Sequence, residues 1–453
     1  MIRKVLFTFV FLSFKLLINA QCWQTIESGS NHCYAIRNDG TLWAWGDNEL
    51  GVLGDSSLID QTKPIKLGTA NQWKIITADD HNAFGIHTDG TLWGWGDNSE
   101  GMMGVGNKIT RIKPFLLSSA TNWLSISNGN YHVLAIKTDG TLWSWGGNAF
   151  GVLGNGSDTA NYIPSKINNT TNWIKISAGN MHSLALKTDG TLWSWGNNLS
   201  GQLGVGSIPF ERSKIPLQIA GNWKYMYAGI HCSFGIKTDG TLWAWGNNNF
   251  GQLGVGDNVE YNLPKQVGND TNWRTISASE FHAVATKTDG TLWTWGRNNY
   301  GQLGDGTKVN RNTPMQVGTE SNWKIGLAAR SSTLALKTDA YIYAWGLNKN
   351  GQQGDGTKVD KIIPKQVICE TSNIEYVATK NDFKVFPNPL TFSDFTIQST
   401  FENTYQIYDI SGKNILYGNL ISGENKIELP QNITNGIYFI QIGNNSQKLI
   451  INQ

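Results

Sequence analysis

The chain has 453 residues, and its 36 basic and 34 acidic side chains give a formal net charge of only +2. This near balance, with 15 % charged residues, gives no electrostatic basis for binding nucleic acid or an anionic membrane surface. Glycine (51) and tryptophan (20) are abundant, and long runs of helix-forming residues are missing, which is typical of an all-β protein rich in turns.

Residues 1–20 have the pattern of a secretory signal peptide. Two basic residues precede the apolar run VLFTFVFLSF, and small residues ending at Ala20 offer a cleavage point before Gln21. A lipid anchor on Cys22 would be the alternative, but Gln21 stands where a lipobox normally requires a small residue. No other segment is apolar enough to cross a bilayer, so we expect no transmembrane segment after signal removal.

From residue 21 to residue 370, one phrase returns in steps of fifty residues. Each unit opens with tryptophan and runs W-x-x-I-S-A-G, a histidine position, an apolar stretch such as SLALKTDG, then TLWSWG-N-N-x-x-G-Q-L-G and a proline. The opening residues are Trp23, Trp73, Trp123, Trp173, Trp223, Trp273 and Trp323. A repeat of this length indicates a propeller or a solenoid, whose units each bury a face against the next.

The local pattern within a unit predicts β-strands. Residues in SLALKTDGTLWSWG alternate between the two sides of an extended chain, and pairs such as Asp189-Gly190 predict a two-residue type I′ hairpin turn. Seven units of about four short antiparallel strands predict a seven-bladed β-propeller. An open solenoid is the alternative, but it would need distinct polar capping units, and none is visible.

The tryptophans are interpreted as scaffold. Of the 20, seven open the units, twelve form six W-x-W pairs, and Trp345 stands in the last unit. Residues two apart, such as Trp43 and Trp45, project from the same side of a strand. A large aromatic side chain that returns in every unit is first of all a packing element.

The repeat resembles the regulator-of-chromosome-condensation repeat in its glycines, histidine, tryptophans and G-Q-L-G box. The resemblance covers all seven units, and the last departs most, with Ser332, Ala340 and Gln353 in place of His, Gly and Leu. It implies a seven-bladed propeller. It implies little about function, because one fold serves unrelated activities.

The last part of the chain predicts a second domain. Residues 371–382 have the composition of a linker, and residues 383–453 predict a small C-terminal β-sandwich from alternating Ile, Tyr and Phe between turn residues. This segment resembles the C-terminal sorting domain of type IX secretion substrates. The matching positions include Pro387, Asn388, Pro389, the segment from Asp409 to Lys413, Gly436, Tyr438 and Lys448. The resemblance implies the type IX secretion machinery as a partner, export across an outer membrane, and usually removal of the tail followed by release or surface attachment. The alternative is an ordinary sandwich domain that stays in place.

The histidines are interpreted as structural. His32, His132, His182 and His282 share one repeat position, which other units fill with Asn82, Cys232 and Ser332. Ligands of one metal ion lie a few ångströms apart, whereas these residues recur once per blade around a ring. We read this position as a buried side chain that ties down a loop of its own blade.

No catalytic residue, metal ligand or cofactor site is predicted. Asp305 and Asp355 in GDGTK lack the spacing of a calcium loop and are read as solvated turn residues. Motifs for a serine nucleophile, a zinc protease or a phosphate-binding loop are missing. Cys33 and Cys232 are read as buried thiols. Cys22 and Cys369 flank the repeats, and we predict a disulfide between them that clasps the first blade to the last.

Two short windows vary while the rest of each unit stays fixed. One precedes the histidine position and the other lies between Asn and the G-Q-L-G box, so a meandering chain would place both on one face. Loops on a rigid scaffold are a common place for binding function. The predicted binding face comprises Tyr131, Met181, Phe281, Phe150, Phe250, Tyr300, Asp79, Asp80, Glu280 and Arg330.

These patterns predict a secreted or surface-displayed, monomeric, non-enzymatic propeller that binds an extracellular protein or glycan. The alternatives are a structural envelope component without a specific ligand, and an enzyme inhibitor similar to the propeller that inhibits β-lactamases. Some relatives of the repeat promote nucleotide exchange on a small nuclear GTPase, but a signal peptide and an export tail would keep this chain away from such a partner.

Overall fold

The computed structural model describes residues 23–208, 211–368, 383–390, 394–400, 402–410, 412–430, 432–442 and 445–451. The chain divides into two compact units, Met1–Cys369 and Glu370–Gln453. The predicted signal peptide (1–20), the predicted linker (371–382) and the predicted disulfide pair, Cys22 and Cys369, lie outside the described residues.

The N-terminal unit consists of seven four-stranded antiparallel sheets, each a simple meander of consecutive strands. The first three sheets contain β1 (Thr25–Ser28), β2 (His32–Ile36), β3 (Leu42–Gly46) and β4 (Gln61–Lys66); β5 (Trp73–Ala78), β6 (Asn82–His87), β7 (Leu92–Gly96) and β8 (Arg111–Ser118); β9 (Trp123–Asn128), β10 (His132–Lys137), β11 (Leu142–Gly146) and β12 (Asn161–Lys166). The fourth and fifth contain β13 (Trp173–Ala178), β14 (His182–Lys187), β15 (Leu192–Asn197) and β16 (Arg212–Ile219); β17 (Trp223–Ala228), β18 (Cys232–Lys237), β19 (Leu242–Gly246) and β20 (Tyr261–Gln266). The last two contain β21 (Trp273–Ala278), β22 (His282–Lys287), β23 (Leu292–Gly296) and β24 (Arg311–Gln316); β25 (Trp323–Ala328), β26 (Ser332–Lys337), β27 (Ile342–Gly346) and β28 (Lys361–Gln366). A short 3-10 helix, η1 (Ala149–Gly151), follows β11.

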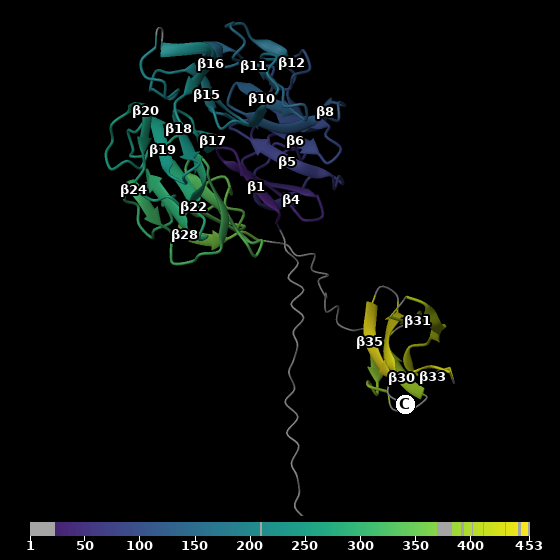
Figure 1. Cartoon of the computed structure of the whole chain (residues 1–453). Coiled ribbons are helices and arrows are strands. Elements are labelled where there is room, and N and C mark those ends of the chain that lie inside the picture. The colour runs from purple at the N-terminus through teal and green to yellow at the C-terminus, as the bar shows by residue number, and fades with distance from the viewer. Residues whose placement is uncertain are drawn as a thin grey trace, which may run out of the picture. The chain divides into compact units, whose positions relative to one another are not determined.

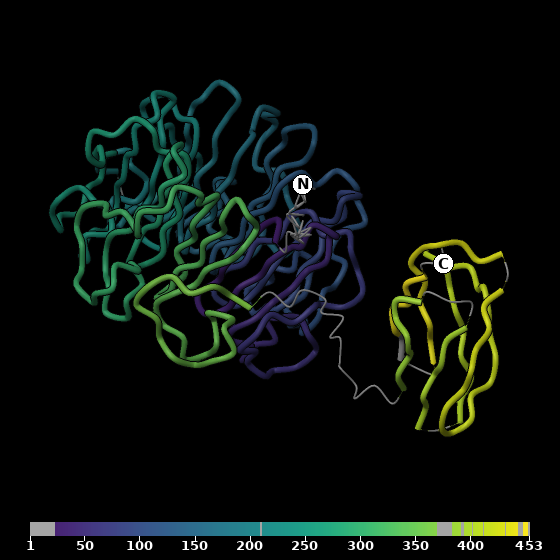
Figure 2. The backbone as a smooth tube through the Cα atoms, turned by 90° about the horizontal axis from the view of Figure 1, so that it is seen from below, coloured from purple at the N-terminus to yellow at the C-terminus, as the bar shows by residue number. Residues whose placement is uncertain are grey.

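The seven sheets form a closed ring, with β1, β5 and β17 near its centre and β8, β16, β20 and β24 at its periphery (Figure 1). The last blade packs on the first: the Trp23 amide donates to the Ala340 carbonyl (3.2 Å), and the Gly356 amide donates to the Thr62 carbonyl (2.9 Å). Figure 2 shows the last blade in green beside the first in purple. The predicted seven-bladed propeller is confirmed, and the open solenoid is wrong. No strand is shared between the two ends, so side-chain packing and hydrogen bonds close the ring.

The second tryptophan of each W-x-W pair joins neighbouring blades. Its indole N–H donates to the carbonyl of the second residue of the preceding blade's G-Q-L-G box, at 2.6–3.0 Å in all seven blades. The bond from Trp45 to Gln352 crosses the junction between the chain ends. The last glycine of the box, such as Gly54, lies so close to this indole that a Cβ would approach the Trp95 nitrogen to 2.7 Å. The box and the tryptophan of the next blade therefore require each other.

The first tryptophan of each pair serves its own blade. In six blades its N–H donates to the threonine hydroxyl of the D-G-T turn, at 2.8–3.1 Å. The residue before that turn is a cation that covers both this ring and the opening tryptophan in five blades; Lys237, for example, lies 3.5 Å from the Trp243 ring centre. In the last blade Lys337 covers Tyr343 and Trp323 in the same way. In the second blade His87 instead stacks on Trp93. The opening indoles have no hydrogen-bond partner for their N–H among the described residues, so they act by packing alone.

A buried asparagine fixes the loop that carries the second variable window. Asn48 and its six equivalents accept a hydrogen bond from the amide of the third residue of the G-Q-L-G box, at 2.8–3.0 Å. The Asn48 amide group also donates to the carbonyls of Ser57 and Ile59. The window residues between this asparagine and the box therefore stand on a rigid base.

The predicted type I′ turn at the Asp-Gly pairs is wrong. Only the glycine has a positive φ (77° at Gly40), and Gly40 N–H bonds the Arg37 carbonyl (2.9 Å), which makes a three-residue loop of a type I turn followed by a left-handed residue. The aspartate has a different role, because its carboxylate accepts bonds from the amide and hydroxyl of Thr41. The sequence D-G suits both turns. The bond from the following amide to the aspartate, which Tyr341 also makes to Asp339 in the last blade, accompanies the observed turn in all seven blades.

The outer strand of every blade contains a proline. These residues are Pro64, Pro114, Pro164, Pro216, Pro264, Pro314 and Pro364. Proline cannot donate to a neighbouring strand and is a common device that keeps edge strands from pairing with other chains. The exposed edges of the blades are therefore poor templates for edge-to-edge association.

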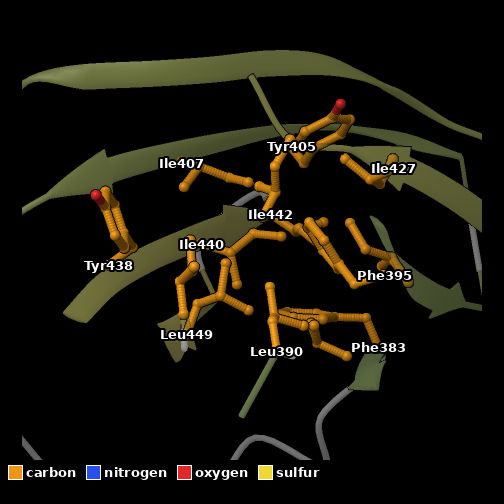
Figure 3. Close-up of a cluster of buried hydrophobic side chains, with 14 of the residues drawn as sticks. Phe383, Leu390, Phe395, Tyr405, Ile407, Ile427, Tyr438, Ile440, Ile442 and Leu449 are labelled. Carbon is orange, nitrogen blue, oxygen red and sulfur yellow. The ribbon is translucent and has the colours of Figure 1, made fainter. Parts of the chain in front are cut away.

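The C-terminal unit is a β-sandwich. One sheet has the order β29-β30-β33 and the other β32-β31-β34-β35. The strands are β29 (Phe383–Phe386), β30 (Asp394–Ser399), β31 (Asn403–Asp409), β32 (Asn414–Leu420), β33 (Gly423–Glu428), β34 (Gly436–Ile442) and β35 (Asn445–Ile451). Side chains of both sheets, such as Phe395 and Ile440, meet in one apolar core (Figure 3). The predicted all-β fold is confirmed.

The sorting-motif residues pack around the last strand. The Asn388 side chain donates to the Lys448 carbonyl (2.7 Å) and accepts from the Ile450 amide (3.0 Å). Tyr438 is buried, and its hydroxyl donates to the Thr434 carbonyl (2.9 Å). Pro387 and Pro389 flank Asn388 on the surface, Gly436 begins β34, and Lys448 projects outward. The P-N-P segment thus fastens the start of the domain to its final strand.

Ala340 carries backbone strain that glycine would relieve. It has φ of 65° in a turn whose other six copies hold glycine. We expect Ala340→Gly to raise the free energy of unfolding by about 1 kcal/mol. The matched control, Gly290→Ala, should lower it, because the new Cβ would approach the Ser321 carbonyl to 2.0 Å. Thermal unfolding of both variants checks this, and a lower midpoint for Ala340→Gly would contradict it.

Candidate binding face and central cavity

The meander places both variable windows of each blade on one face of the propeller. The first window joins the innermost strand to the second, and the other joins the third to the outermost, while the Asp-Gly turns lie at the opposite end. We call this surface the loop face, defined by residues 29–31 and 47–60 of the first blade and their equivalents.

The predicted aromatic residues occupy the loop face, but not as one patch. Phe250 and Phe281, from neighbouring blades, pack edge to face with ring centres 5.3 Å apart. The Arg297 guanidinium lies 5.0 Å and 4.8 Å from these two rings. Phe150, with φ of 64° in η1, and Met181 are half-buried and make no such pair. Tyr131 and Tyr300 are the exposed aromatic members.

The sequence analysis missed three residues of this face. Leu50 and Leu199 lie in the second window and expose 39 % and 60 % of their surface, more than any predicted aromatic residue. Their place in the variable window was the available signal. Arg297 is the third, and no sequence pattern separates it from other surface cations.

The predicted charged residues fall into two groups. Glu280 and Arg330 form an ion pair (3.4 Å) between half-exposed side chains, a kind of contact that contributes little stability. Asp80 accepts a hydrogen bond from the Ser30 hydroxyl. Asp79 differs, because its Oδ2 atom is buried and has no hydrogen-bond partner. Burial and the neighbouring Asp80 raise the pKa of Asp79 well above its usual value.

A cavity of about 400 Å³ occupies the centre of the ring and is lined by the innermost strands of all seven blades. Asp79 and Asp80 belong to its wall, as does Glu27, which the sequence analysis missed. Burial raises the pKa of Glu27 to about 8. A second hollow of about 240 Å³ on the loop face is lined partly by Asp47, Glu49 and Asp80. The loop face is therefore acidic around the first two blades.

The histidine position joins neighbouring blades, and in the sixth blade it also holds its own loop as predicted, since His282 Nδ1 is bonded to Ser279 Oγ (3.1 Å). His132 Nε2 bonds Ser183 Oγ (2.8 Å), and His182 and His282 make the same contact to Ser233 (2.8 Å) and Thr333 (2.9 Å) in the next blade. For His32 the equivalent position in the next blade holds Ala83, and its Nε2 atom has no hydrogen-bond partner among the described residues. Burial lowers the pKa of these four histidines to about 3, so they are neutral.

Asp305 and Asp355 are turn residues but are not solvated, which corrects the prediction. The side chains expose 5 % and 8 % of their surface. The Asp305 carboxylate accepts bonds from Thr307 and Arg311. Although burial alone would raise it, these bonds hold the pKa of Asp305 below its usual value. They anchor the same loop as the buried asparagine.

The cysteines and the metal-binding residue types form no reactive centre in the part of the chain that the structure describes. Cys33 and Cys232 are buried free thiols, and burial raises the pKa of both. Across the described ranges, no three His, Cys, Asp or Glu side chains are placed to hold one metal ion. The same ranges contain no helix long and apolar enough to cross a membrane.

Protein families match both units. The RCC1-like domain family matches residues 118–386, and two regulator of chromosome condensation (RCC1) repeat families match residues 89–136 and 23–52. The secretion system C-terminal sorting domain family matches residues 384–452. A comparison with curated protein sequences finds no match.

Solved structures share the fold at low identity. Human WBSCR16 is 21 % identical with a TM-score of 0.65, over 72 % of this chain and 94 % of that protein. Prp20p from *Saccharomyces cerevisiae* is 20 % identical with a TM-score of 0.66, over 81 % and 90 %. Yeast RCC1 (Prp20) bound to Kap60 is 19 % identical with a TM-score of 0.65, over 82 % and 88 %. At this identity the likeness shows the propeller fold and nothing about ligands.

The histidine contact is tested by Ser183→Ala. The change leaves His132 Nε2 buried without a partner, and we expect a loss of about 1–3 kcal/mol in the free energy of unfolding. The chain supplies a control, because in the fifth and sixth blades the same two repeat positions hold Cys232 and Ala283, which belong to one buried cluster. The double variant His132→Cys, Ser183→Ala copies that pair and should recover part of the loss. Equal denaturation midpoints for Ser183→Ala and the parent would refute an inter-blade role.

Proposed function

We propose that this chain, which belongs to the RCC1-like domain family and ends in a secretion system sorting domain, is a non-enzymatic propeller that binds an extracellular protein or glycan through its loop face. The sorting domain makes it a secreted protein that is attached to the cell surface or released. A partner therefore meets it outside the cell. The partners named for the yeast relatives, which are Kap60, Gsp1p and histones, do not carry over to such a chain.

The observation that supports binding is the contrast between the repeated residues and the two variable windows of each blade. The repeated residues are occupied by contacts within and between blades, as Trp45, Asn48 and His132 illustrate. The windows vary from blade to blade, lie on one face and expose Leu50, Leu199, Tyr131 and Tyr300. Exposed aromatic and aliphatic side chains on a rigid base are typical anchors of interfaces.

Two other functions predict different behaviour. A structural envelope component would show no saturable ligand. An inhibitor of the β-lactamase-inhibitor kind would use the same face, and its partner would be an enzyme whose activity falls on binding. Neither has an observation of its own among the described residues, so binding of a protein or glycan is the function we propose.

Binding is tested by removing the exposed anchors. The full mature chain is immobilised and its ligands are captured from extracellular protein and glycan fractions. We expect a partner that is retained by the parent and lost, by at least about tenfold in affinity, when Leu50 and Leu199 become serine and Tyr131 and Tyr300 become alanine.

The matched control removes as many exposed apolar side chains from the outer strands. Ile163, Ile215, Leu263 and Ile363, each 55–58 % exposed, are changed to serine. This control should bind like the parent. Equal capture by both quadruple variants, or none by the parent, would contradict a loop-face binding function.

Processing is tested by the intact mass of the exported protein. We expect a chain that begins at Gln21, has lost the sorting domain and weighs two hydrogen atoms less than the reduced form, because Cys22 and Cys369 are joined. Cys22→Ser should abolish that difference and lower the thermal midpoint, since a clasp over so long a loop contributes up to about 5 kcal/mol. A mass that corresponds to residues 21–453 would contradict removal of the tail.

A further inference from the structure

Two acids in the wall of the central cavity break the repeat in neighbouring blades. The position of Glu27 is filled elsewhere by Thr77, Ser127, Ser177, Tyr227, Ser277 and Leu327. The position of Asp79 holds glycine in four blades, and serine or alanine in the other two. Glu27 is close enough to contribute to the raised pKa of Asp79. Two repeat positions that are uncharged in the other blades therefore carry acids in the first and second blades.

Both positions are unfavourable places for a carboxyl group. Serine at the first position accepts the amide of the next blade, as Ser127 does from Ala178 (3.0 Å), and Glu27 gives up this contact. At the second position neighbouring blades approach so closely that a Cβ on Gly129 would lie 2.0 Å from the Gly179 carbonyl. Glu27 instead accepts a long hydrogen bond from the neighbouring Ser28 amide (3.4 Å), and residues that break a structural rule are expected at functional sites.

The cavity also contains polar atoms that lack partners. Asp79 Oδ2, Asn180 Oδ1 and Ser125 Oγ are buried, line the cavity and make no hydrogen bond among the described residues. Two of these atoms, the amide oxygen and the carboxylate oxygen in its ionised form, can accept hydrogen bonds but not donate them. Apolar side chains such as Ile126 and Met226 complete the wall. Acceptors above an apolar wall suit a ligand that has an aliphatic stem and a group rich in donors.

We propose that the central cavity binds a primary ammonium group, a lysine side chain of a partner that docks on the loop face, with Glu27 and Asp79 as its acceptors. This inference rests on the proposed function and deepens it by naming the group that the partner inserts. An ammonium carries three donors and one charge, which matches two carboxyl groups and an unpaired amide oxygen. No third metal-binding side chain joins the two acids among the described residues, so the donor set favours an organic cation.

Proton release accompanies this binding. Burial raises the pKa of Glu27 to about 8 and that of Asp79 above its usual range, so the empty cavity holds at least one proton near pH 7. An entering ammonium favours the ionised carboxylate, and the displaced proton goes to solvent. The other titratable side chains in the cavity wall are Asp80, Lys175, Tyr225, Tyr227 and Arg330. Arg330 is paired with Glu280, and Lys175 donates to the Lys224 carbonyl.

The test measures binding of a short peptide to the full mature chain by calorimetry at pH 7. The probe is acetyl-Gly-Gly-Lys-Gly-Gly-amide, and the neutral comparison replaces lysine with norleucine. We expect saturable binding of the lysine peptide only, with heat that depends on the ionisation enthalpy of the buffer. Asp79→Asn and Glu27→Gln should each weaken it at least about tenfold. Free 1,5-diaminopentane, tested in parallel, shows whether a small amine suffices.

The control variant is Glu320→Gln, which removes an exposed carboxylate outside both the cavity and the loop face and should bind like the parent. Asp79→Asn should melt no lower than the parent, because it replaces a buried acid without a partner by a neutral group. If Asp79→Asn does melt lower, its weaker binding is not used, and peptide binding by Glu27→Gln alone tests the proposal. Absence of binding by the parent, equal binding of the norleucine peptide, or unchanged binding by the acid variants would overturn the proposal.

The two proposals fail separately. The quadruple loop-face variant changes no residue that lines the central cavity, so it should still bind the lysine peptide after losing its large partner. If the cavity binds no lysine peptide but capture still depends on Leu50 and Tyr131, the loop face is the binding site and the proposed lysine contact is wrong. Binding of the lysine peptide without any capture of a large partner would support the cavity site and contradict the loop-face function.

Discussion

The propeller depends on one repeated hydrogen bond, from the indole of the second W-x-W tryptophan (Trp345 in the last blade) to a carbonyl of the preceding blade. The same carbonyl, as in Val152, can also accept the hydroxyl of Ser183, to which His132 is bonded. Each such tryptophan is almost fully buried, and truncation of a residue of this size typically costs about 3–5 kcal/mol. Because the contact recurs across the chain ends through Trp45 and Gln352, no blade lacks a neighbour on either side.

This constraint separates structural from functional residues. A position that touches the next blade must suit two surfaces at once, so it can change only where both agree, as Cys232 and Ala283 of the fifth and sixth blades show. A window residue such as Leu199 contacts solvent and carries no such requirement. Variation therefore collects on the loop face for a physical reason, and the sorting domain directs this propeller to secretion.

The sequence predicts the fold well because the fifty-residue period arises from one inter-blade contact, the tryptophan hydrogen bond, that is made seven times. It predicts local geometry less well. The Asp-Gly pairs suit two kinds of turn, and the observed one is accompanied by bonds such as those from Thr41 to Asp39. Asp305 reads as a surface acid because its partner Arg311 lies beyond the loop. The contact between Phe250 and Phe281 joins different blades and cannot be read from either window. Glu27 departs visibly from the repeat, but only the three-dimensional structure shows that this position faces a cavity.

Departures from the repeat do not all mean the same thing. Gln353 replaces a leucine in the last blade, donates to the Gly346 carbonyl (2.6 Å), and leaves its Oε1 atom buried without a partner. Asp79 also leaves an oxygen unpaired. The difference is what lies beside it. Gln353 lines neither of the two cavities described above, whereas Asp79 borders the central cavity next to a second acid. A polar atom that is unpaired in packed surroundings only lowers stability. A polar atom that faces a cavity can instead form its hydrogen bond with a ligand. The free energy lost by leaving that atom unpaired is then regained on binding and adds to the affinity.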